Sequence, residues 1–131
     1  FYKDDSLNDP LVIETVALEM GWTYRDQLEQ IKQYTYDINK ILLAYFASIG
    51  LDLIDFKLEF GIHSEKKVWR SPGRETHGTV ETLLLADEFS PDSCRLWDMK
   101  TGEKLDKDRF RFDLGDAMEG YHEIAKRMGV L

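Results

Sequence analysis

The sequence predicts an α+β fold in which an antiparallel β-hairpin packs with helices, and three observations carry this prediction. Apolar and polar residues alternate over DFKLEFG (55–61), which is typical of a half-buried strand. A very apolar segment, VETLLLADEF (80–89), follows after one loop, so the two segments are expected to pair. Apolar residues recur at three- and four-residue steps over 23–50 and indicate a long amphipathic helix.

Two helices are expected before the hairpin. Residues 8–21 form the first, with Asn8 or Asp9 as its N-cap, Pro10 in its first turn and Gly21 at its end. Residues 23–50 form the second helix.

In this second helix, Thr23 and Asp26 resemble a capping box at the start, and Gly50 is expected to end the helix. The apolar stripe along it is interpreted as contact with the core rather than as a ligand site. The stripe comprises Leu28, Ile31, Thr35, Ile38, Leu42, Tyr45 and Ile49.

The expected hairpin has strands at 51–62 and 80–89, joined by a loop at 63–79 that turns at Pro72-Gly73. The remaining segment, 106–129, is expected to be helical, with a bend or break at its internal glycines, Gly115 and Gly120. Without a repeat or a clear boundary, residues 1–131 are interpreted as one domain with the element order ααββα.

Bulk properties exclude several classes of function. The chain has 131 residues, a net charge of −8 and a pI near 4.8, so a basic nucleic-acid-binding surface is not expected. No apolar run approaches the ~20 residues that span a bilayer, so no membrane partner is expected. The single cysteine, Cys94, fits a reducing compartment and predicts a cytoplasmic protein. The acidic start, FYKDDSLND, is not a signal peptide, and without an initiating Met we expect a processed, trimmed or excised piece.

The charged residues of DFKLEFG (55–61) form the main candidate site. Alternation places Asp55, Lys57 and Glu59 on one face of the predicted strand, and hairpin pairing brings Asp87 near them. The opposite face, turned to the core, consists of Phe56, Leu58 and Phe60. Two neighbouring carboxylates repel unless a cation lies between them, and Mg²⁺ accepts such ligands together with phosphates. Two interpretations stay open: a nucleotide–Mg²⁺ site in which Lys57 holds a phosphate or carboxylate, and a salt-bridged sheet face.

Other chemical signals are weaker. Asp92 and Arg95 are expected to form a turn ion pair, or Arg95 presents its planar fork to a phosphate. Cys94 has no partner histidine in a motif, so nucleophilic catalysis is not expected. His63 and His77 without further ligands are a weak zinc signal.

Four stretches together resemble one family. KDDSLNDP, DFKLEFG, LADEFSPDSCRLWD and TGEKLDKDRFR resemble, in order, motifs of the bacterial phosphoribosylaminoimidazole-succinocarboxamide synthases, or SAICAR synthetases. The resemblance implies an ATP-grasp-like and kinase-like architecture. It implies a ligase of de novo purine biosynthesis that uses ATP and Mg²⁺ to join L-aspartate to carboxyaminoimidazole ribonucleotide (CAIR). The implied products are SAICAR, ADP and phosphate, and the implied intermediate is an acyl phosphate.

The resemblance also implies roles for residues around the nucleotide. Glu59 and Asp87 match carboxylates that bind the metal and the nucleotide phosphates, and Glu88 is expected beside them. Lys57 matches a lysine that contacts the reacting carboxylate and the phosphates, and Lys3 matches a nucleotide-contacting lysine.

A second set of residues is implied to bind the ribonucleotide. Arg95 matches an arginine that holds the 5′-phosphate, and Asp92 matches a polar contact to the same substrate. Asp55 and Arg111 fall on family positions near the ligands. The residues expected to be catalytic are Lys57, Asp87 and Arg95.

The chain departs from the family pattern in two ways. The family's N-terminal lobe, which clamps the nucleotide, is missing from it, so residues 1–131 are expected to form the C-terminal ATP-grasp-like domain and to be inactive alone. The full-length protein is expected to be a dimer. The loop after DFKLEFG carries an extension, WRSPGRETHG. Two other functions stay open: a non-catalytic nucleotide-binding or oligomerising domain, and Mg²⁺-dependent phosphoryl transfer to another acceptor.

Overall fold

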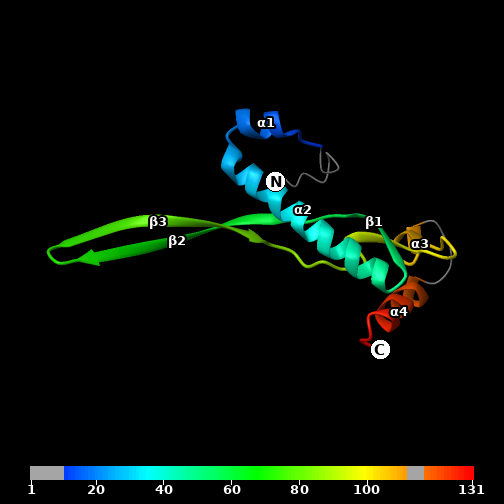
Figure 1. Cartoon of the computed structure of the whole chain (residues 1–131). Helices are drawn as coiled ribbons and strands as arrows, with labels where there is room; N and C mark the ends of the chain where they lie inside the picture. The colour runs from blue at the N-terminus through cyan, green and yellow to red at the C-terminus, as the bar shows by residue number, and fades with distance from the viewer. Residues whose placement is uncertain (1–10, 112–116) are drawn as a thin grey trace. The chain divides into compact units, whose positions relative to one another are not determined.

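Two antiparallel strand pairs organise the computed structural model, which describes residues 11–111 and 117–131 (Figure 1). One sheet holds the first and last strands, and the other holds the two strands between them. The strands are β1 (Leu51–Phe56), β2 (Phe60–Ser71), β3 (Arg74–Leu85) and β4 (Cys94–Asp98). The expected mixed α+β class with antiparallel pairing is therefore confirmed.

The expected single strand 51–62 is wrong, because residues 57–59 cross from one sheet to the other. The backbone N–H of Lys57 donates to the carbonyl of Ser93 at 2.7 Å, which keeps it beside β4. The carbonyl of Glu59 accepts from the N–H of Ala86 at 2.9 Å, which places it beside β3. The alternating pattern continues through this crossing and does not reveal that the hydrogen-bond partner changes. The alternate residues Phe56, Leu58 and Phe60 are only half-buried.

The segment 63–79 is not a loop but most of a long hairpin arm (Figure 1). Strands β2 and β3 pair without a register break and are joined at Pro72-Gly73, as the sequence predicted. Gly73 has a φ of 76°, the left-handed conformation that the third residue of a type II turn requires. On the arm, the Trp69 ring occupies the space above Gly78, where an added Cβ would lie 2.7 Å from a ring carbon.

Strand β4 was not expected, because its sequence CRLWD follows a turn and is short. Its side chains alternate: Cys94, Leu96 and Asp98 are buried, whereas Arg95 and Trp97 are partly exposed. This alternation is the period-2 pattern of a strand with one covered face.

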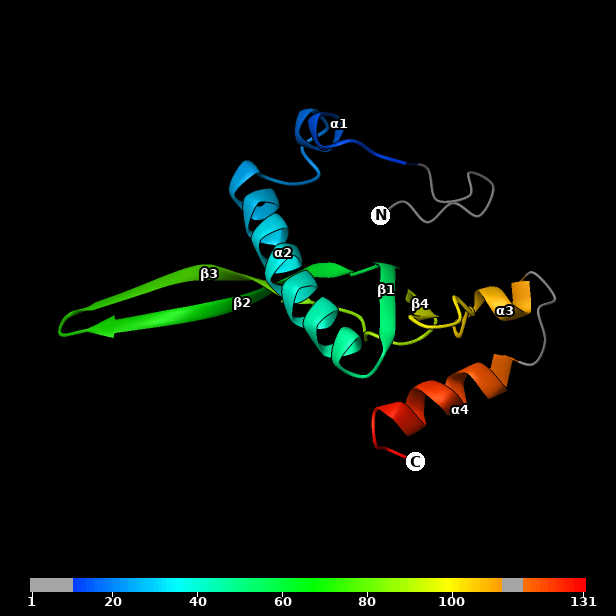
Figure 2. The same ribbon diagram turned by 45° about the vertical axis from the view of Figure 1, so that its right-hand side comes forward.

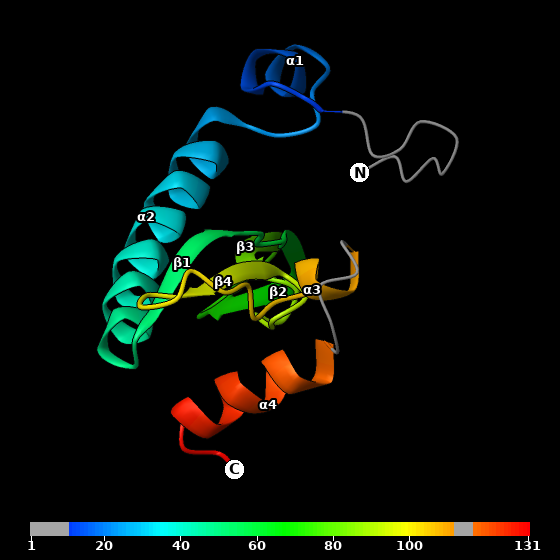
Figure 3. The same cartoon turned by 90° about the vertical axis from the view of Figure 1, so that its right-hand side faces the viewer.

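The hydrophobic core lies where β1, β4, the end of α2 (Arg25–Ser48) and α4 (Ala117–Arg127) meet. Its buried members are Phe46, Leu51, Leu53, Cys94, Leu96, Leu105 and Ile124. Figure 2 shows β1 and β4 side by side, and Figure 3 shows α4 running past them. The core therefore supports one sheet, while the arm of β2 and β3 contributes no residue to it.

The chain divides into two units, residues 1–34 and 35–131, and α2 runs through the boundary. In the first unit, α1 (Glu14–Glu19) is shorter than the expected helix 8–21, and its proposed caps at 8–10 lie outside the described residues. Lys32 and Glu14 form an ion pair at 2.8 Å that links α1 to α2. Gly21 takes the expected left-handed conformation.

The start of α2 is capped by a residue other than the one expected. The side chain of Gln27, not of Asp26, accepts from the N–H of Tyr24 at 3.1 Å and from the Thr23 hydroxyl at 3.0 Å. Gln is one carbon longer than Asp and sits at the third helical position, which suits this reach. Gly50, with a φ of 75°, ends the helix as predicted.

The apolar stripe along α2 is half-buried for the most part. Phe46, outside the expected stripe, is its only buried residue among those described, and Tyr45 is exposed.

The C-terminal segment forms two helices, α3 (Asp108–Arg111) and α4. Gly115 lies outside the described residues. Gly120 does not break α4; it lets the helix approach a neighbouring loop, since an added Cβ would lie 2.5 Å from the carbonyl oxygen of Leu105. Among the described residues, no helix is long and apolar enough to cross a membrane.

Candidate functional site

Of the four charged groups predicted to lie together, Lys57, Glu59 and Asp87 do meet, at the crossing between the two sheets, whereas Asp55 pairs with Arg95. The Lys57 ammonium lies 2.6 Å from a Glu59 carboxylate oxygen and 4.0 Å from an Asp87 carboxylate oxygen. Their side chains are between 38% and 61% exposed, so a ligand from solvent can reach all three. The backbone bonds of Lys57 and Glu59 fix this arrangement from both sheets.

This cluster has the donor set of a hard-cation and phosphate site. Two carboxylates share one ammonium, and a second cation would relieve their repulsion. Oxygen donors of this type suit Mg²⁺, which takes one or two carboxylates and fills its other positions with water and substrate phosphates. Within the described part of the chain, no group of three or more His, Cys, Asp or Glu side chains could hold a metal alone, so phosphate oxygens would have to contribute. Glu88 contributes its backbone N–H to Asp87 at 3.0 Å, which orients that carboxylate.

Arg95 pairs with Asp55 rather than with Asp92, so the expected turn ion pair is wrong. The two residues face each other across β1 and β4, where a register shift precedes Asp55. The Arg95 guanidinium donates from Nε to Asp55 Oδ1 at 2.8 Å and from Nη2 to Oδ2. This pair lowers the pKa of Asp55 and raises that of Arg95, because each charge stabilises the other.

Asp92 has two other partners. Its Oδ1 accepts a hydrogen bond from the Tyr121 hydroxyl at 2.5 Å, and its backbone carbonyl accepts one from the Lys107 ammonium. The Cys94 thiol is buried in the core and donates to the carbonyl of Ser90 at 3.3 Å. Burial raises the pKa of Cys94 to about 12, which agrees with the expectation that it is no nucleophile.

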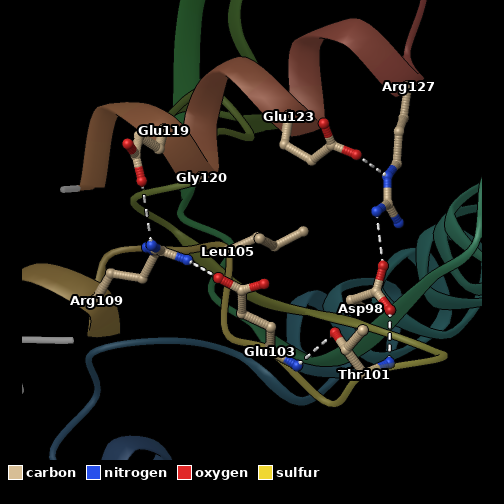
Figure 4. Close-up of a pocket in the computed structure, with 9 residues that line it drawn as sticks. All are labelled: Asp98, Thr101, Glu103, Leu105, Arg109, Glu119, Gly120, Glu123 and Arg127. Atoms are coloured by element: carbon tan, nitrogen blue, oxygen red, sulfur yellow. Dashed lines mark hydrogen bonds and ion pairs between the residues drawn. The ribbon is translucent and has the colours of Figure 1, made fainter. Parts of the chain in front are cut away.

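A pocket of about 290 Å³ lies between α4 and the loop that follows β4 (Figure 4). Its charged walls are already paired: Arg127 donates to Asp98 at 2.6 Å and to Glu123 at 2.7 Å, and Arg109 donates to Glu103. Two backbone N–H groups and Arg127 lower the pKa of Asp98. The Arg127–Asp98 pair fastens α4 to β4, and none of the predicted site residues lines the pocket.

Three residues that shape the site were missed by sequence reasoning. The fully buried Asp106 carboxylate accepts from the N–H groups of Leu96 and Asp108, each at 2.8 Å. Lys107 and Tyr121 hold Asp92. The signal for Asp106 and Lys107 was present in TGEKLDKDRFR, but Tyr121 lies in an ordinary helical pattern without one.

The side chains of two predicted site residues are not described by the structure. Lys3 lies outside the described residues. Arg111 is the last residue of α3, and its side chain is also outside them. Their roles stay predictions.

Comparisons with known protein sequences all lead to one family. The sequence profile described as SAICAR synthetase matches residues 1–128. Proteins named phosphoribosylaminoimidazole-succinocarboxamide synthase are 48% identical in Acinetobacter baumannii and 50% identical in Magnetococcus marinus, each over 130 residues. Each alignment covers 99% of this chain and 48% of the relative, so the chain spans about half the length of the curated relatives it matches.

Solved structures of the same family are also similar to this chain. The phosphoribosylaminoimidazole-succinocarboxamide synthase of Ehrlichia chaffeensis matches with a TM-score of 0.80 and 43% identity, over 99% of this chain and 50% of that one. A SAICAR synthetase in complex with ADP matches with a TM-score of 0.76 and 42% identity, over 96% of this chain and 47% of that one. The fold is thus a mixed α+β fold of the SAICAR synthetase type. The chain belongs to the SAICAR synthetase family.

Proposed function

We propose that the chain forms half of an ATP-dependent ligase that joins L-aspartate to CAIR and releases SAICAR, ADP and phosphate in de novo purine biosynthesis. The observation that carries this proposal is the meeting of Lys57, Glu59 and Asp87 at one exposed point. Membership of the family supports it, as does the relative that was solved with ADP.

The chemistry requires activation of a poor acyl donor. The γ-phosphate of ATP is transferred to the carboxylate of CAIR, and the aspartate amine then attacks the acyl phosphate and displaces inorganic phosphate. Lys57 offsets negative charge as the phosphoryl group moves, which is the main catalytic need in such transfers. Arg95 binds the 5′-phosphate, with Asp55 fixing the plane of its guanidinium. Asp92 binds a polar group of the same ribonucleotide.

The residues present fit Mg²⁺. Glu59 and Asp87 would hold it together with nucleotide phosphates, and the ion would neutralise phosphate charge when bound. Lys57, which already lies within reach of both carboxylates, orients them toward a shared ligand.

Several broader proposals follow from the same resemblance. The chain is the C-terminal, ATP-grasp-like domain, and a preceding nucleotide-clamping lobe completes the active site. The complete protein is cytoplasmic and dimeric. Lys3 contacts the nucleotide, and Arg111 lies near the ribonucleotide.

The test is ADP release by a complete protein that carries this chain, with Mg·ATP and CAIR, with and without L-aspartate. ADP that depends on both substrates supports the ligase. A folded, complete protein that releases no ADP would overturn it and would favour the non-catalytic domain. Release with CAIR replaced by another acceptor would instead favour a different phosphoryl transfer.

A further inference from the structure

Helix α4 is fastened to the β1–β4 sheet by three kinds of contact. Ile124 lies in the hydrophobic core. Arg127 donates to Asp98 at 2.6 Å and to the carbonyl of Gly50 at 3.1 Å. Gly120 allows close approach of the helix to the backbone of Leu105 (Figure 4). The position of α4 is therefore fixed at both ends of its described length.

Tyr121 follows Gly120 directly, and this fixed helix sets where its hydroxyl lies. The ring packs against the core, and the hydroxyl donates to Asp92 Oδ1 at 2.5 Å. Burial, and then the hydrogen bond to Asp92, raise the pKa of Tyr121 to about 12. The phenol therefore keeps its proton at neutral pH and acts as a donor.

Asp92 is held from a second side as well. The Lys107 ammonium donates to its backbone carbonyl. Asp92 lies within a turn that Ser93 closes, since the Ser93 hydroxyl donates to the carbonyl of Ser90 at 3.0 Å. The Asp92 Oδ2 atom accepts no hydrogen bond from any residue in the described ranges, so it is available to a ligand.

We propose that Tyr121 is a positioning residue for the ribonucleotide: it holds Asp92 Oδ1 so that Oδ2 is presented to the substrate. The inference rests on the proposed function, in which Asp92 and Arg95 bind CAIR. Helix α4 would then contribute to substrate binding through the Tyr121–Asp92 contact, and Tyr121 lies outside the sequence motifs.

The test is calorimetric titration of the complete protein with CAIR, for the wild type, Tyr121→Phe, Asp92→Ala and the double variant. Loss of one hydrogen bond to a charged group predicts about tenfold weaker CAIR binding in Tyr121→Phe. In the Asp92→Ala background, which has no side-chain acceptor for the tyrosine hydroxyl, Tyr121→Phe should weaken CAIR binding by less than about a further twofold, because Tyr121 acts through Asp92. Tyr45→Phe, which alters an exposed tyrosine on α2, is the matched control and should leave the Kd unchanged.

The Michaelis constants give an independent readout. Tyr121→Phe should raise KM for CAIR and leave KM for ATP unchanged, whereas a merely structural loss would change both. Unchanged CAIR binding in Tyr121→Phe, or additive losses in the double variant, would overturn the inference. Because the titration needs no turnover, an inactive wild type that still binds CAIR refutes the ligase without deciding against Tyr121. A wild type that binds no CAIR refutes both.

Discussion

Arg95 on β4 and Asp55 on β1 form a two-pronged ion pair across neighbouring strands, with Nε 2.8 Å from Oδ1. This pair fixes the plane of the guanidinium and leaves its Nη1 donors outside the pair, where a phosphate can be bound. Asp55 and Arg95 are both expected to contact the ribonucleotide. In this structure Asp55 contacts Arg95.

The Asp55–Arg95 pair should make stability depend on pH in the acid range. The pKa of Asp55 is lowered from 3.8 by its hydrogen bonds with Arg95, so the folded state binds this proton more weakly than the unfolded state. The pair's contribution is then present above pH 3.8 and is lost as the pH falls through the folded pKa. Urea unfolding of the wild type and Asp55→Asn should show a stability difference at neutral pH that vanishes in acid. A difference that is independent of pH would contradict the assignment.

Removing the Lys57 ammonium should slow the chemistry and spare the fold. Lys57→Ala in the complete protein is expected to lower kcat for ADP release by about 10²–10³, the usual loss when one charge-stabilising group is removed. The matched control is Lys40→Ala, since Lys40 is 76% exposed on α2 and pairs with Asp37 three residues earlier on the same helix. Normal turnover of Lys57→Ala would show that the cluster is a salt-bridged surface.

Gly120 should be intolerant of a side chain. Gly120→Ala places a Cβ 2.5 Å from the carbonyl oxygen of Leu105, so α4 must shift, and the overpacking should cost about 1–3 kcal/mol in the free energy of unfolding. At Gly61 the same substitution meets only the Cβ of Ala86 at 3.5 Å and should change stability by less than about 0.5 kcal/mol. Equal effects at the two positions in denaturant unfolding would contradict the close approach.

The hairpin arm should be dispensable for the site. Replacing residues 64–81 by Asn-Gly joins His63 to its partner Thr82 through a favoured two-residue turn. Because Glu59 and Ala86 remain bonded below the cut, Mg·ADP binding by the complete protein should change by less than about twofold. The deeper replacement of 60–85 removes the base of the hairpin and should abolish binding. Loss of binding in the shorter replacement would show that the arm forms part of the nucleotide site.

Local patterns predicted the elements whose signals are local. The helix ending at Gly50 and the turn at Pro72-Gly73 were predicted because a left-handed glycine marks each. The split of DFKLEFG between two sheets and the pairing of β1 with β4 were not predicted. Alternation indicates which way side chains point, but not which strand supplies the hydrogen bonds. The loop prediction at 63–79 failed because nearly all of these residues are exposed on both faces of a two-stranded arm, so no buried face marks them as strand.

The part of the site that was predictable is the part that depends on a local hairpin. Lys57, Glu59 and Asp87 come together because the two ends of one hairpin are adjacent. The contacts of Asp92 with Tyr121 and Lys107 join segments that are distant in sequence, and no periodicity encodes them. The partner of Arg95 was mistaken, since a nearby acid in sequence was preferred over one on the opposite strand.

The central claim, that Glu59 and Asp87 bind the nucleotide and Arg95 binds the ribonucleotide, is tested most directly by crossed titrations of the complete protein. Mg·ADP and CAIR would each be titrated into the wild type, Asp87→Asn and Arg95→Ala. Asp87→Asn should weaken Mg·ADP binding and spare CAIR, and Arg95→Ala should do the reverse, because each removes a charge from one site only. Variants that weaken both ligands equally, or neither, would contradict the two-site assignment.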